Sequence, residues 1–143
     1  PSLAGWNGFG LAVQAYQTRA LQVIDAVASI AHEHKLRLMV RLVKGAYWDS
    51  EVKRAQMDGQ PDYPVFTTKQ ATDVSYLACA DALLRTGPAI YAQFATHNAH
   101  SLASIDMMAK RAESGPECSS RVMAWIITLR DFSSTTSPAR ARS

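Results

Sequence analysis

The stretch 36–49, LRLMVRLVKGAYWD, decides how the rest of this chain is organised. Its apolar first part, 36–43, is typical of a buried strand. Arg41 lies inside that strand, and a buried guanidinium needs an anion or several hydrogen-bond acceptors. Lys44 and Gly45 follow, just before a helical pattern that offers free N–H groups to an anion, and glycine lets a ligand approach the backbone closely. The stretch therefore predicts a strand that ends in a binding site.

Composition places the chain among globular proteins. Its 143 residues are 48% hydrophobic, enough for one core. A net charge of +3 is too small to indicate a nucleic-acid partner. Cys79 and Cys118 match no metal-ligand spacing, and Cys79 is expected in the core. No apolar run has the length of a membrane span, and no secretory signal is visible. With Pro1 in place of methionine, a cytosolic setting and a fragment of a longer protein both fit.

The flanking patterns alternate between strand and helix. Helical spacing of apolar residues and breaks at glycine and proline define the segments. Strands are expected at 10–15, 36–43 and 89–95, and helices at 17–34, 49–57, 69–85 and 99–112. Because no tight hairpin separates the strands, they should pair in parallel through right-handed helical crossovers. The sequence thus predicts an α/β fold.

Polar residues follow each of the expected strands. They are Gln14, then 44–46 (KGA), then 96–98 (THN). In a parallel sheet the carboxyl ends of the strands share one edge, where such folds bind ligands. We therefore expect these residues to lie together.

Each of these residues also has a structural explanation. Gln14 could be bonded to a neighbouring loop, and the THN segment could cap the following helix. Tyr47 and Trp48 could plug the end of the sheet rather than contact a ligand. Arg41 has the weakest structural explanation, since a charge inside a strand needs a partner.

Longer motifs carry a family resemblance. The segments 41–49 (RLVKGAYWD), 13–16 (VQAY) and 94–98 (FATHN), together with 63–67 (YPVFT) and 72–80 (TDVSYLACA), resemble the proline dehydrogenase domain. The similarity is greatest to the form found in bacterial bifunctional proline utilisation A proteins. It extends from about Leu3 to Ala109.

The resemblance implies a distorted (β/α)8 barrel, of which this chain supplies part. It implies an FAD enzyme that oxidises L-proline to 1-pyrroline-5-carboxylate and passes the electrons to quinone. Arg41 would be catalytic beside the flavin ring, and Tyr47 would lie near the proline. The resemblance assigns the cofactor to Gln14, Arg41, Val43, Lys44, Gly45, Ala46, Trp48, Thr96, His97 and Asn98. It also implies a cytoplasmic, homo-oligomeric parent that associates peripherally with the inner membrane, and no metal.

The chain departs from the family pattern in length and at its end. A whole barrel needs roughly 250 residues. The family's upstream lysine and aspartate are absent, as are its downstream tyrosine and paired arginines. We therefore expect a partial barrel over 1–112 and a divergent, disordered tail over 113–143, which is rich in Ser, Thr and Arg.

Three hypotheses remain on the sequence. The chain is part of an FAD-dependent proline dehydrogenase, or it is a non-catalytic remnant that cannot hold FAD on its own. The third is an unrelated phosphate-binding barrel that uses Lys44 and Gly45.

Overall fold

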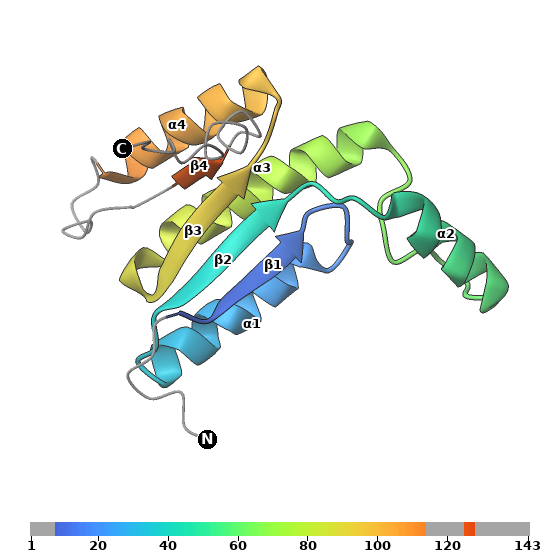
Figure 1. Cartoon of the computed structure of the whole chain (residues 1–143), viewed down its shortest axis with the longest axis horizontal. Helices are drawn as coiled ribbons and strands as arrows, with labels where there is room; N and C mark the ends of the chain where they lie inside the picture. Colours follow the sequence, from blue (N-terminus) through green and yellow to red (C-terminus); the bar gives the residue numbers. More distant parts are fainter. Residues whose placement is uncertain (1–7, 114–124, 128–143) are drawn as a thin grey trace, which may run out of the picture.

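The computed structural model describes residues 8–113 and 125–127, which form a parallel sheet with helices packed against it (Figure 1). The elements in chain order are β1 (Gly10–Gln14), α1 (Ala20–Glu33), β2 (Leu38–Val43), α2 (Trp48–Met57), α3 (Lys69–Arg85), the 3-10 helix η1 (Gly87–Ala89), β3 (Ile90–Ala95), α4 (Ala99–Glu113) and β4 (Trp125–Ile127). Helices α1 and α3 lie behind the strands, while α2 projects away from the sheet near the carboxyl end of β2 (Figure 1).

The strands pair in the order β1-β2-β3-β4, and every pair is parallel. Ala12 is the register partner of Arg41, which in turn is the partner of Gln93. The predicted parallel α/β arrangement is confirmed.

A fourth strand adds to the three expected from the sequence. Residues Trp125–Ile127 pair with β3, although they fall within the tail predicted to be disordered. They belong to an apolar segment, and the edge of β3 offers unpaired backbone groups to such a segment. The rest of the predicted tail, 114–124 and 128–143, lies outside the described residues.

The core lies between the sheet and the helices. Strand β2 alternates, with Leu38, Val40 and Leu42 buried on the helical side. Val40 and Leu42 pack in one cluster with buried residues of α1, α3 and β3, including Ile24, Tyr76 and Phe94. Burial of such side chains contributes about 1.5–3 kcal/mol each.

Arg41 lies on the opposite face of β2 and is exposed, so the prediction that it is buried is wrong. Successive side chains of a strand point to opposite faces, and the neighbours of Arg41 in the strand face the core. No described helix packs on the face that carries Arg41. We call this face, with Ala12, Arg41 and Gln93 in one row, the open face.

One helix begins later than predicted, and another has the predicted bounds. Helix α1 begins at Ala20 rather than residue 17, because the N–H groups of Ala15 and Tyr16 still donate to the carbonyls of Val43 and Lys44, each at 2.8 Å. Helix α3 occupies the predicted range, and its N-cap Thr68 accepts a hydrogen bond from the N–H of Ala71 at 3.3 Å. Cys79 is fully buried, as expected.

Candidate functional site

A cavity of about 630 Å³ lies at the carboxyl ends of β2 and β3. It is lined by Arg41, Val43, Lys44, Gly45, Ala46, Lys69, Ala95, Thr96, His97 and Asn98. The parallel sheet brings these residues together from segments about 50 positions apart, as expected for strand ends on one edge. The lining contains every residue that the sequence assigned to a cofactor except Gln14 and Trp48.

The cavity is positively charged. Arg41, Lys44 and Lys69 all line it, and no aspartate or glutamate of the described residues does. Like charges gathered around a concave surface raise the local concentration of an oppositely charged ligand. The lining therefore suits a ligand that carries negative charge.

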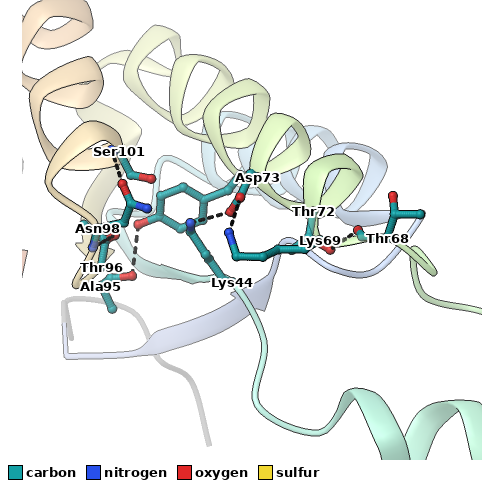
Figure 2. Close-up of polar contacts among 10 residues, drawn as sticks. Lys44, Thr68, Lys69, Thr72, Asp73, Ala95, Thr96, Asn98 and Ser101 are labelled. Atoms are coloured by element: carbon teal, nitrogen blue, oxygen red, sulfur yellow. Dashed lines mark hydrogen bonds and ion pairs between the residues drawn. The ribbon is translucent and has the colours of Figure 1, made fainter.

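Asp73 stands behind two of these cations, as Figure 2 shows. One carboxylate oxygen accepts a hydrogen bond from Lys44 Nζ at 2.5 Å, and the other accepts one from Lys69 Nζ at 2.5 Å. The hydrogen bond from Lys44 lowers the pKa of Asp73 below its usual value, and that from Lys69 lowers it further. Asp73 is thus held ionised between the two lysines.

This carboxylate should make stability depend on pH at the acid end. Because the folded pKa of Asp73 is lowered, its contribution is complete above the unfolded value of about 3.9 and disappears as pH falls through the folded value. The side chains of Lys44 and Asp73 are 27% and 34% exposed, and that of Lys69 is 76% exposed. Because solvent screens these charges, we expect Asp73→Asn to cost at most about 1 kcal/mol of unfolding free energy at pH 7. Urea unfolding of the unaltered chain and of Asp73→Asn, at pH 7 and near pH 2, measures this cost. An equal cost at both pH values would contradict the linkage.

Tyr76 connects α3 to both strand ends. Its buried ring lies beneath Lys44 Nζ, 5.6 Å from the ring centroid. Its hydroxyl donates a hydrogen bond to the carbonyl of Ala95 at 3.0 Å. Burial raises the pKa of Tyr76 to about 12, so the hydroxyl stays protonated and remains a donor. Helix α3 therefore fixes Lys44 and the end of β3 relative to each other.

Position 45 requires glycine because the backbone there lies close to the Tyr16 ring. Its φ of +136° is rarely adopted by other residues, and a Cβ at this position would lie 2.6 Å from the Tyr16 ring. Tyr16 itself is only 2% exposed. Burial raises the pKa of its hydroxyl, and the nearby charge of Glu51 raises it further. The position of the backbone at the cavity wall thus depends on this packing.

The turn after β3 is stabilised as a helix cap. The side-chain oxygen of Asn98 accepts from the N–H of Ser101 at 3.1 Å, and the N–H of Asn98 donates to Thr96 Oγ1 at 3.1 Å (Figure 2). The capping interpretation of this segment is confirmed, with Asn98 rather than His97 as the cap. His97 is exposed and lines the cavity.

Three predicted site residues do not line the cavity. Trp48 donates its indole N–H to the carbonyl of Phe66 at 2.8 Å, which anchors the loop before α3. Tyr47 is 64% exposed. The carbonyl of Gln14 accepts from the N–H of Gln17 at 3.1 Å. That these three residues contact a ligand stays a prediction.

Sequence reasoning missed Lys69, Asp73 and Tyr76. Lys69 and Asp73 are four residues apart on a helix, the spacing at which opposite charges pair. That spacing could have suggested their pairing, but their meeting with Lys44 depends on how α3 packs beside β2. Within 8–113 and 125–127, no group of three or more His, Cys, Asp or Glu side chains could hold a metal ion, and no helix could cross a membrane.

A parallel α/β sheet with a cationic cavity at the carboxyl ends of its strands has the arrangement in which proteins of the β/α type bind their ligands. The model of the family described as proline dehydrogenase matches residues 1–124. The chain belongs to the proline dehydrogenase family, which confirms the resemblance seen in the sequence.

Several relatives support this assignment. The bifunctional protein PutA of Escherichia coli (strain K12) is 62% identical over 109 residues, covering 76% of this chain and 8% of that protein. The hydroxyproline dehydrogenase of Mus musculus is 35% identical over 106 residues, covering 68% of this chain and 21% of that protein. This chain thus spans only a small part of either relative.

Solved structures share the fold. Proline utilization A (PutA) of Bradyrhizobium japonicum, in a D779Y mutant, is 60% identical with a TM-score of 0.74, covering 77% of this chain and 11% of that one. A PutA structure with proline bound in remote sites is 53% identical with a TM-score of 0.79, covering 90% and 12%. The expected fold of a partial β/α barrel is confirmed.

Proposed function

We propose that the cavity is part of an FAD site and that these residues serve the oxidation of L-proline to 1-pyrroline-5-carboxylate, with electrons passed to quinone. One observation carries the proposal: the cavity lining comprises all but two of the residues that family resemblance assigns to the flavin. The 62% identity to a bifunctional PutA protein, against 35% to a hydroxyproline dehydrogenase, favours proline as the substrate.

The residues present fit such a cofactor. FAD carries a pyrophosphate, and the part of the chain that the structure describes gives the cavity lining three cations and no carboxylate. Its volume of about 630 Å³ is in the usual range for cofactor pockets. Backbone at Gly45 and Ala46 lines the wall without a large side chain between it and the cavity. When bound, FAD would supply the acceptor for a hydride from proline.

The chain's own residues would bind and polarise. Arg41 lies on the open face, where its permanent charge can stabilise negative charge that develops on a ligand. Lys44 adds a second fixed cation, since Asp73 and Tyr76 hold it from below. Thr96 presents a buried side chain in the lining, and His97 presents an exposed one.

The non-catalytic alternative is favoured by one observation, the exposure of Arg41. In a water-filled surrounding a cation stabilises charge far less than in a closed site. We place the activity in a cytoplasmic parent that completes the barrel and associates peripherally with the inner membrane.

The test replaces the matching 109-residue segment of the E. coli PutA protein with that of this chain. We expect this chimera to be yellow and to reduce a dye when proline is added. The isolated 143-residue chain with added FAD should not, because its described sheet leaves Arg41 uncovered. A folded but colourless chimera would refute the proposed cofactor role. Dye reduction by the isolated chain would refute the need for a complete barrel.

A further inference from the structure

Two lysines from different elements meet on one carboxylate beside the cavity. Lys44 follows β2, and Lys69 is the first residue of α3, yet both donate to Asp73 at 2.5 Å. Both lysines line the cavity, whereas Asp73 does not. Figure 2 shows the two ammonium groups meeting on the Asp73 carboxylate. The negative charge therefore lies between the two ammonium groups but outside the cavity lining.

This arrangement restricts two side chains that are otherwise among the most flexible. A lysine that must be ordered when a ligand binds weakens that binding, and one that is already held does not. Lys44 is held most firmly, because the buried Tyr76 ring lies under it and its side chain is only 27% exposed. Lys69 is 76% exposed, so the contact with Asp73 is its main restraint among those found.

We propose that Asp73 is a positioning residue, whose carboxylate holds the ammonium groups of Lys44 and Lys69 as a ready-made anion subsite of the cavity. The chemistry this subsite would take is a phosphate or pyrophosphate group. That the group belongs to FAD rests on the proposed function, but the subsite itself does not.

A simple charge argument predicts the opposite effect of removing Asp73. If the lysines acted only as point charges, loss of the neighbouring negative charge would strengthen the attraction of an anion. If Asp73 positions them, its loss should weaken binding despite the more positive surroundings. The sign of the change therefore separates the two explanations.

The experiment measures the binding of inorganic pyrophosphate to the 143-residue chain by calorimetry at low ionic strength, where screening is weak. We expect Asp73→Asn to bind on the order of three- to tenfold more weakly. The matched control is Asp81→Asn on the same helix, which loses an equivalent pair with Arg85 away from the cavity. Its affinity should be unchanged, and circular dichroism should show both variants folded.

A zero-length carbodiimide cross-linker gives an independent readout on the unaltered chain. Since one carboxyl group forms only one amide, it should join Asp73 to Lys44 in some molecules and to Lys69 in others, with the Asp106–Lys110 pair as the positive control. A missing link between 44 and 73, pyrophosphate affinity that is unchanged or tighter in Asp73→Asn, or no pyrophosphate binding by the unaltered chain would each overturn the inference. A colourless chimera would instead refute the flavin proposal and leave this subsite intact.

Discussion

Gly45→Ala is expected to lower the free energy of unfolding by about 2–5 kcal/mol. The new Cβ would lie 2.6 Å from the Tyr16 ring, and the φ of +136° is itself unfavourable for alanine. Tyr16 cannot move aside easily because it is 2% exposed. Urea unfolding, followed by circular dichroism, measures the loss of stability. If the unaltered chain is only marginally stable, the variant will be unfolded even without urea.

Two controls isolate the cause. Gly59→Ala shares a positive φ of +62° but has nothing within 4 Å, so its cost should be about 1 kcal/mol. In a Tyr16→Ala background the clash disappears, and Gly45→Ala should then cost only what the backbone conformation demands. An unchanged cost in that background would show that contact with Tyr16 is not the cause.

Arg41→Met should slow proline oxidation by the chimera on the order of 10²-fold. Reduction adds negative charge to a flavin, so removing a nearby cation destabilises the reduced form more than the oxidised form. The two-electron potential should therefore fall by ~30 mV for each 1.4 kcal/mol of lost interaction. Stopped-flow reduction by proline and potentiometric titration measure the two effects.

The matched control for this variant is Arg37→Met. Arg37 precedes β2 at the other end of the strand, where its guanidinium lies 5.8 Å from the centroid of the Tyr91 ring. It does not line the cavity, so both rate and potential should stay near those of the unaltered chimera. If Arg41→Met also leaves both values unchanged, Arg41 has only a structural role.

Local patterns in the sequence were sufficient for the elements and for the edge at which they converge. Helix α3 has the predicted bounds because its N-cap Thr68 and the break at Gly87 are encoded next to it. The polar residues after β2 and β3 could be placed together because parallel crossovers bring the carboxyl ends of strands to one edge. The alternating pattern within β2 also predicts that Arg41 is exposed. Interpreting its apolar neighbours as one continuous buried run led to the opposite prediction.

Only the tertiary structure decided how the cavity is built. Nothing local says that Lys44 meets Asp73, 29 positions away, or that Tyr76 supports both Lys44 and Ala95. These contacts arise from the packing of α3 against two strands at once, which depends on the shapes of many core side chains. The same reason explains Gly45: the sequence predicted that a ligand approaches the backbone there, whereas the fold shows the Tyr16 ring in close contact with it. Short-range chemistry thus determined which residues are present at the edge, while long-range packing determined which of them touch.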